Sequence, residues 1–194
     1  MPELPEVETV RRTLEPCVGA KILGLWLSGK PLRMNRAVPR ARLQTLVGSR
    51  IVAVARLGKY LLLETSGKGS LLVHLGMSGR LRLQAAGTSK GKHTHVLFEL
   101  SGKRELHFSD PRRFGQVDLV VRGREREHPS LRALGPDPLL DGIDPEELYE
   151  RSRGRSGAVK SFILSQQVIA GVGNIYAAEA LWRCRLHPDK PAGA

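Results

Sequence analysis

The sequence has 194 residues, which fits one large domain or two small ones, and its 31 Lys and Arg against 19 Asp and Glu give a formal net charge of +12. No apolar run reaches the roughly 18 residues of a membrane span, the N-terminus lacks the apolar region of a signal peptide, and two cysteines form neither a disulfide framework nor a metal-ligand set. We therefore expect a cytoplasmic protein whose positive charge favours a nucleic-acid partner, with a merely soluble surface or a ribosomal-type RNA binder as the alternatives.

The first predicted element is a helix over residues 5–18. Pro5 is typical of a first helical position, and apolar residues recur on one face at Val7, Val10, Leu14 and Val18. The packed helix is expected to hold its own start, which carries Pro2, Glu3 and Glu6, in place.

Between about residues 21 and 121 the apolar period changes to two, which predicts short strands separated by glycine-containing turns. The predicted strands are Ile51–Arg56, Tyr60–Glu64, Leu71–Leu75, Arg80–Gln84, Thr94–Leu100, Glu105–Phe108 and Gln116–Val121. Several strands at this spacing indicate an antiparallel sandwich or barrel.

After a basic stretch at residues 122–128, the sequence predicts mainly helices. Asp144 followed by Pro145 predicts a capped helix start, a second helix fits residues 158–167, and a third is expected to begin with Asn174 as its N-cap and to run to about residue 185. We therefore predict an α+β protein, with a β-rich domain over residues 1–128 and a helical domain over residues 129–194.

Four separated segments of the sequence carry a resemblance that covers the whole chain. They are Pro2-Glu-Leu-Pro-Glu-Val-Glu-Thr9, His74-Leu-Gly-Met-Ser-Gly79, Asp110-Pro-Arg-Arg-Phe-Gly115, and Gln166 with Ala170-Gly-Val-Gly-Asn-Ile-Tyr-Ala177. In this order, with Lys59 after Gly58 between the first two, they resemble the bacterial formamidopyrimidine-DNA glycosylase family, which excises 8-oxoguanine and ring-opened purines and then cleaves the abasic strand. The resemblance implies an N-terminal antiparallel β-sandwich with a leading helix, followed by an all-helical helix–two-turn–helix domain.

By this resemblance, Pro2 is the nucleophile once Met1 has been removed. An α-amino group titrates at roughly 7.7–8.0, so a useful neutral fraction exists near pH 7. Attack on the sugar C1′ expels the base and leaves an iminium ion, which carries its positive charge without a proton and acidifies the C2′ hydrogen for elimination. The ordinary alternative is a proline that only starts a helix.

The resemblance gives Glu3 an acid–base role at the sugar ring and makes Glu6 a support of the same site, although a helix-dipole role explains Glu6 nearly as well. Lys59 is implied to reach the DNA backbone at the lesion, whereas a turn lysine is usually only solvated. His74 is implied to contact a phosphate, and a lone strand histidine is more often structural.

Met77 and Phe114 lie at turns, flanked by glycine or polar residues, where core residues are uncommon. In the family the residues at Met77, Arg112 and Phe114 enter the gap left by the expelled base, with Arg112 bonded to the orphaned partner base. Arg113 is implied to bind a phosphate. The alternative for the arginine pair is a solvated loop.

Asn174 lies where glycines precede a helix, which is a typical anion site. The resemblance implies that Asn174 contacts a phosphate near the flipped nucleotide and that Lys160 adds a backbone contact.

The sequence departs from the family in one respect, because the family continues into a zinc finger with two Cys-x-x-Cys pairs and no such pair occurs here. We therefore expect a truncated form without metal or cofactor, which folds without zinc and binds DNA weakly.

The expected partner is double-stranded DNA with a damaged base, bound by a monomer near the bacterial nucleoid. The expected activity is bifunctional, with excision of oxidised purines followed by β,δ-elimination. Alternatives are an endonuclease VIII-like enzyme for oxidised pyrimidines, a damage-binding fragment with little turnover, and a generic RNA-binding structural protein.

Overall fold

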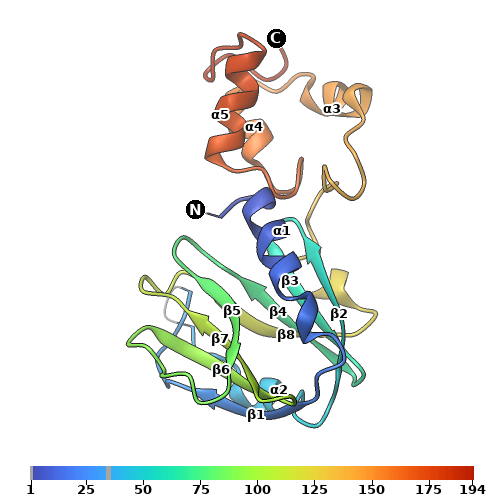
Figure 1. Cartoon of the computed structure of the whole chain (residues 1–194). Coiled ribbons are helices and arrows are strands. Elements are labelled where there is room, and N and C mark those ends of the chain that lie inside the picture. The colour runs from blue at the N-terminus through green and yellow to red at the C-terminus, as the bar shows by residue number, and fades with distance from the viewer. Residues whose placement is uncertain (1, 34–35) are drawn as a thin grey trace. The chain divides into compact units, whose positions relative to one another are not determined.

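The computed structural model of the chain describes residues 2–33 and 36–194, and it divides into two compact units with the boundary between Glu125 and Arg126 (Figure 1). The first unit is built mainly of strands and the second of helices, so the predicted α+β class is confirmed. The sequence placed the boundary after residue 128, whereas the structure divides the chain after residue 125.

The sheet unit contains one leading helix, one short helix and eight strands among its described residues. They are α1 (Leu4–Thr13), β1 (Ile22–Leu27), α2 (Arg40–Gln44), β2 (Ile51–Leu57), β3 (Tyr60–Thr65), β4 (Gly69–His74), β5 (Arg80–Ala85), β6 (Thr94–Leu100), β7 (Arg104–Ser109) and β8 (Gln116–Val121). The seven predicted strands are β2 to β8. Neither β1 nor α2 was predicted, because a bulge near Gly24 interrupts the alternation in β1 and the five residues of α2 are too few to show a helical period.

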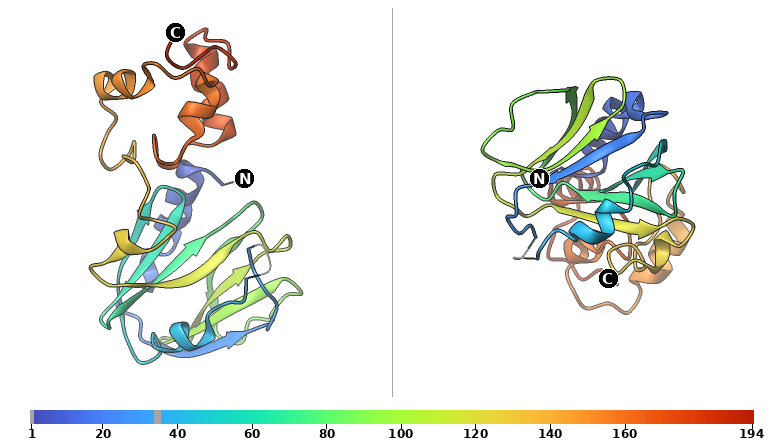
Figure 2. Two further views of the ribbon diagram at one scale, coloured as in Figure 1. Left: turned by 180° about the vertical axis from the view of Figure 1, so that it is seen from behind. Right: turned by 90° about the horizontal axis from the view of Figure 1, so that it is seen from below.

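The strands form two four-stranded sheets that lie face to face, as the two layers in the right-hand view of Figure 2 show. One sheet has the order β1-β6-β7-β5 and the other the order β2-β3-β4-β8, and every pair is antiparallel. The predicted antiparallel sandwich is therefore confirmed.

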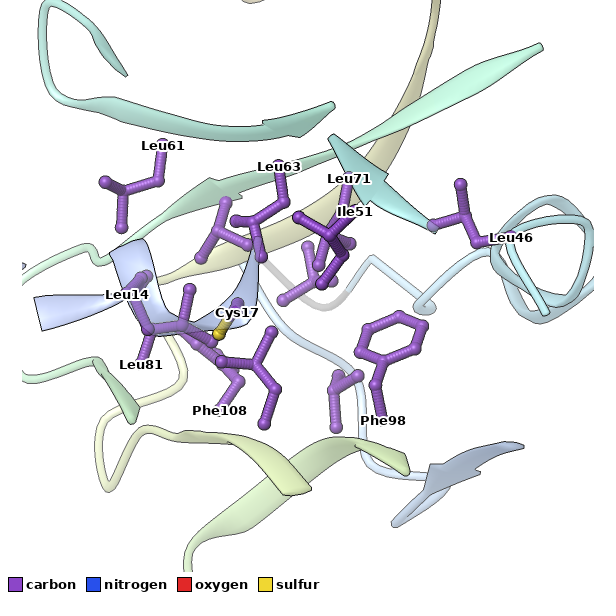
Figure 3. Close-up of a cluster of buried hydrophobic side chains, with 14 of the residues drawn as sticks. Leu14, Cys17, Leu46, Ile51, Leu61, Leu63, Leu71, Leu81, Phe98 and Phe108 are labelled. Carbon is purple, nitrogen blue, oxygen red and sulfur yellow. The ribbon is translucent and has the colours of Figure 1, made fainter. Parts of the chain in front are cut away.

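The apolar core lies between the two sheets (Figure 3). Leu61 and Leu63 project into it from β3, and Phe98 and Phe108 project from the opposite sheet. Burial of these side chains stabilises the fold by about 25 cal/mol for each Å² of apolar surface removed from water. The core fixes the sheet ends from which the turns with the candidate site residues emerge.

Helix α1 ends earlier than the sequence predicted, at Thr13 instead of residue 18. Pro16 cannot donate a backbone hydrogen bond and its ring opposes a continuing α-helix, so residues 15–17 form a 3₁₀ turn. The turn rotates Cys17 into the core and leaves Val18 43% exposed, which makes the prediction of Val18 on the packed face wrong. Leu14 is fully buried, as expected.

The helical unit contains α3 (Pro145–Ser152), α4 (Val159–Leu164) and α5 (Asn174–Arg183). Asp144 caps α3 by accepting hydrogen bonds from the N–H groups of Glu146 and Glu147, as predicted. Phe162, Val168 and Ile169 form a small apolar core of this unit. None of the described helices is long and apolar enough to cross a membrane.

Two helix boundaries in this unit differ from the predictions. Helix α4 ends at Leu164 instead of residue 167, since the Gln166 side chain binds backbone groups of the following turn. Gly173, in an extended conformation, is the N-cap of α5, and Asn174 is the first helical residue. The prediction that Asn174 caps this helix is therefore wrong.

Leu14 and Val18 offer a test of the α1 boundary. Leu14→Ala removes a fully buried side chain and should lower the free energy of unfolding by about 2–5 kcal/mol. Val18→Ala should change it by less than about 1 kcal/mol, because the side chain is already 43% exposed. Urea denaturation of both variants measures the difference, and similar losses would show that the helical face extends to Val18.

Candidate functional site

The start of α1 is held by a reciprocal pair of glutamates. Glu3 is the N-cap, its backbone N–H donates to Oε2 of Glu6 at 2.9 Å, and its own carboxylate accepts from the N–H of Glu6, which makes a capping box. Glu3 is only 1% exposed, so its carboxylate is not solvated as that of a typical N-terminal acid is. Pro2, one residue earlier, lies beside this fixed pair.

Lys59 lies next to that buried carboxylate, although the two are far apart in sequence. Gly58 and Lys59 form the two-residue turn between β2 and β3, and the positive φ of Gly58 (57°) suits the first central position of such a hairpin. Burial lowers the pKa of Lys59, and the nearby charge of Glu3 acts in the opposite direction. The structure thus brings Pro2, Glu3 and Lys59 to one end of the sheet unit.

Arg56 is a buried charge beside this group that the sequence analysis missed. Its guanidinium donates to Oε2 of Glu8 at 3.2 Å and to the carbonyl oxygen of Gly58 at 3.0 Å. Burial alone would raise the pKa of Glu8, but hydrogen bonds from Arg12, Arg11 and Arg56 together lower it. In sequence Arg56 appeared only as the polar end of an apolar strand, and no local pattern marked it as buried.

A second group of candidate residues lies on two turns that Asp110 holds together. Asp110 is fully buried, its Oδ1 accepts from the Ser78 hydroxyl (2.6 Å), and its Oδ2 accepts from the Gly115 N–H (2.7 Å). A Cβ on Gly76 would lie 2.6 Å from the Gly115 nitrogen, and one on Gly115 would lie 2.5 Å from the Phe108 ring. The two turns therefore touch backbone to backbone, which only glycine allows at these positions.

The side chains at the tips of these turns are exposed. Met77 is 42% exposed and Phe114 is 48% exposed, so the turn-tip location predicted for both is as expected. The Arg112 guanidinium lies over the Phe114 ring, 4.8 Å from its centroid. Arg113 has a φ of 57°, a conformation that costs a non-glycine residue on the order of 1 kcal/mol and that no local sequence pattern predicts.

His74 precedes the first of these turns and is held as a neutral ring. Its Nδ1 accepts a hydrogen bond from the N–H of Gly76 at 3.1 Å, and its ring packs against Tyr60 with 4.7 Å between centroids. Burial, with further contributions from Arg33 and Lys59, lowers the pKa of His74 to about 4. The ring therefore supports the Met77 turn in its uncharged form.

An open groove of about 1000 Å³ in the sheet unit joins the two groups. Its lining includes Pro2, Glu6 and Met77, and Arg80 and Lys92 are among its cationic residues. A polyanion whose reacting sugar lay at Pro2 would therefore meet positive charge in the same groove.

The helical unit presents the start of α5. Gln166 fixes the preceding turn, because its Oε1 accepts from the Gly171 N–H (2.9 Å) and its Nε2 donates to the Val172 carbonyl (2.8 Å). Asn174 is exposed at this helix start, and Lys160 lies half-buried on α4, which packs against α5. A rigid turn before an exposed helix start is suited to binding an anion.

The described residues do not fit the zinc site that the resemblance implies for the family. No group of three or more His, Cys, Asp or Glu side chains within residues 2–33 and 36–194 is arranged to hold a metal ion. Cys17 is buried in the sheet core, where burial raises the pKa of its thiol to about 11, and Cys184 is exposed in the other unit.

Comparison with known proteins matches both units. The family models for the formamidopyrimidine-DNA glycosylase N-terminal domain and H2TH domain match residues 1–117 and 134–194. The formamidopyrimidine-DNA glycosylases of Nitrosococcus oceani and Methylococcus capsulatus are 46% and 47% identical, over 99% and 100% of this chain and 70% of each relative.

Solved structures are also similar to this chain over nearly its whole length. MutM in complex with DNA containing carbocyclic 8-oxo-G has a TM-score of 0.89 at 34% identity, over 99% of this chain and 71% of the other. Lactococcus lactis Fpg (MutM) in complex with DNA containing an oxidised pyrimidine has a TM-score of 0.86 at 33% identity, with the same coverage.

The neutral state of His74 predicts a pH dependence of stability. The unfolded chain takes up a proton on this ring below about pH 6.5, whereas the folded chain resists it down to about pH 4, so the free energy of unfolding should fall as the pH decreases through that window. Between pH 7 and 4.5 the contribution of His74 should be about 2 kcal/mol, measured by urea denaturation.

His74→Asn offers an uncharged acceptor to the Gly76 N–H and should flatten this dependence by that amount. His93→Asn is the matched control, because His93 is exposed on the same unit, and it should keep the wild-type dependence. An unchanged pH dependence in His74→Asn would contradict the neutral state of this ring.

Proposed function

The chain belongs to the formamidopyrimidine-DNA glycosylase family, and from this membership we infer that it excises oxidised purines such as 8-oxoguanine and formamidopyrimidines from duplex DNA and cleaves the resulting abasic strand. The observation that carries the assignment at the level of residues is the convergence of Pro2, the buried Glu3 and the buried Lys59 at one end of the sheet unit. The positive net charge of +12 suits a DNA partner.

In the proposed reaction the secondary amine of Pro2, freed by removal of Met1, attacks C1′ of the damaged nucleotide. The N–C1′ bond forms as the bond from C1′ to the base breaks, and the base leaves with the electron pair and takes up a proton. Glu3 holds or transfers a proton at the sugar ring, a contribution typically worth about 10²–10⁴-fold in rate. The capping box supports this role because it fixes Glu3 beside the amine.

The amine then loses its proton and the C1′–O4′ bond breaks, with O4′ taking up a proton, which leaves an iminium ion between the Pro2 nitrogen and C1′. This iminium ion draws electrons from the sugar, so the C2′ hydrogen can be removed as a proton while the 3′ phosphate leaves. A second elimination releases the 5′ phosphate, and water returns the amine to Pro2. Lys59 is proposed to hold the backbone phosphate at the lesion. Its burial beside Glu3 supports a fixed position for this ammonium, unlike that of a solvated turn lysine.

Met77 and Phe114 are proposed to fill the gap left by the expelled base, with Arg112 bonded to the orphaned base. Their exposure supports this role, because a wedge must be accessible before the duplex binds. The two turns that carry them are held together by the hydrogen bonds of Asp110. His74, Arg113, Lys160 and the start of α5 at Asn174 are proposed to bind phosphates. His74, being neutral and bonded through Nδ1, can donate to a phosphate only through Nε2.

We further propose that the two described units act as a monomer and use no resident metal or cofactor. The arrangement of the site supports a reaction without a metal or cofactor, because amine attack and elimination need only the Pro2 nitrogen and proton transfer by neighbouring side chains.

An oxidised-pyrimidine activity is the second candidate, since one of the similar structures holds DNA with that lesion. Rates on matched duplexes containing 8-oxoguanine or an oxidised pyrimidine distinguish the two. Excision of the purine lesion should be faster, and faster pyrimidine excision would reverse the assignment. Binding without excision or cleavage of an abasic site would favour the damage-binding fragment instead.

The nucleophile is tested by borohydride trapping on an abasic duplex. The chain without Met1 should form a covalent adduct that maps by mass spectrometry to the peptide beginning at Pro2. A chain that retains Met1 differs only in that residue and has no free secondary amine at Pro2, so its adduct should fall to background. An adduct on Lys59, or undiminished trapping when Met1 is retained, would rule out Pro2.

The wedge residues are tested by comparing two substrates. Met77→Ala and Phe114→Ala should slow excision of 8-oxoguanine by about ten-fold or more but slow cleavage of a preformed abasic site much less, since opening the stack costs a few kcal/mol and an abasic site is already partly open. Leu23→Ala, which truncates another exposed apolar residue of the same unit, is the control. Equal losses on both substrates, or a melting temperature lowered by several degrees, would favour a packing role.

A further inference from the structure

Arg56 is one of the largest fully buried side chains of the chain, and the proposed chemistry assigns it no role. A guanidinium cannot lose its charge inside a protein, so its burial is tolerated only where hydrogen-bond acceptors surround it. Two of its acceptors are Glu8 Oε2 and the carbonyl oxygen of Gly58. These acceptors belong to two different elements, helix α1 and the β2–β3 hairpin.

The hairpin side of this contact fixes the peptide bond next to Lys59. The carbonyl of Gly58 belongs to the peptide group that joins Gly58 to Lys59, so the 3.0 Å bond from Arg56 sets the plane of that group. In a two-residue turn the direction of this plane determines where the Lys59 side chain leaves the backbone. A flexible hairpin tip is thereby given one orientation.

The helix side of the contact fixes the distance from α1. Glu8 lies on α1, whose first residues form the capping box, and its carboxylate also binds Arg11 and Arg12. Arg11 in turn donates to the carbonyl oxygen of Val54 on β2 at 3.1 Å. Glu8 and Arg56 therefore lock the helix that presents Pro2 to the hairpin that presents Lys59.

We propose that Arg56 is a positioning residue, which acts through the Gly58 carbonyl and Glu8 to hold the Lys59 ammonium at a fixed place beside Glu3 and Pro2. The inference rests on the proposed function for its catalytic consequence but not for its structural one. A buried ion pair seldom stabilises a fold more than well-packed apolar side chains do. Stability alone therefore does not explain a charge here, whereas a bond to a backbone carbonyl at a hairpin tip explains why an arginine is needed.

The structural consequence is tested by the environment of Lys59, without reference to activity. In the full chain labelled with ¹⁵N-lysine, the pH titration of the Lys59 Nζ signal reports its pKa, and loss of the signal in Lys59→Ala assigns it. In Arg56→Lys, which keeps the charge but cannot reach both acceptors, the pKa of Lys59 should rise toward the ordinary value of a lysine as the side chain gains water. In Arg50→Lys, which alters an exposed arginine bonded to the carbonyl of Gly19, it should not change.

The catalytic consequence is tested by a double-mutant cycle on borohydride trapping with abasic DNA. Arg56→Lys should slow trapping by about 10- to 100-fold in the wild-type background, the loss expected for a misplaced group. The same substitution should cost less than about two-fold in a Lys59→Ala background, because Arg56 acts through Lys59. Glu8→Gln provides a milder second variant should Arg56→Lys fail to fold.

A pKa of Lys59 that stays the same in both Arg56→Lys and Glu8→Gln would overturn the inference. Equal losses of trapping in the wild-type and Lys59→Ala backgrounds would also overturn it, since they would assign Arg56 a general structural role. If the wild-type chain traps no DNA at all, the proposed function fails, and the titration of Lys59 still decides whether Arg56 positions it.

Discussion

Buried charged side chains between α1 and the β2–β3 hairpin fix the position of the N-terminal end of the protein. Glu3, Arg56 and Lys59 are 1%, 2% and 7% exposed, and an unpaired charge at this depth would cost several kcal/mol. The apolar face of α1 alone would tolerate small rotations and translations of the helix against the sheet. The buried charges do not, because each displacement separates a carboxylate from its partner. The N-terminal end of the chain is thus held by electrostatics, while the core supplies the stability.

The turns that carry Met77 and Phe114 expose apolar side chains instead of burying charged ones. Apolar side chains in water tend to collapse onto the protein surface. Here the backbone is fixed by a carboxylate that accepts from neutral groups, with Asp110 bonded to Ser78 and Gly115. The two turns meet backbone to backbone at Gly76 and Gly115, where neither position has room for a side chain. Buried polar contacts therefore hold the backbone that presents the two exposed side chains.

The sequence predicted those features that depend on local patterns. Alternating apolar residues placed the strands β2 to β8, and the Asp144-Pro145 pair placed the start of α3, since both signals act within a few residues. It failed where the outcome depends on distant groups. The buried Arg56 depends on Glu8 on α1, and the N-cap of α5 at Gly173 follows a turn that Gln166 fixes. Among the candidate site residues, the turn-tip exposure of Met77 and Phe114 was predictable, whereas the burial of Lys59 beside Glu3 was not.

The glutamates at the start of α1 show how closely folding and chemistry are joined in this protein. Glu6 closes the capping box through the N–H of Glu3 and also lines the groove beside Pro2, so a substitution there alters the helix start and the site together. A loss of activity in a Glu6 variant consequently says little about chemistry unless the helix start is shown to be intact. Gln at either position retains an oxygen that can accept the same backbone N–H while it loses the negative charge. Glu3→Gln and Glu6→Gln therefore separate the charge of each carboxylate from its role in the capping box.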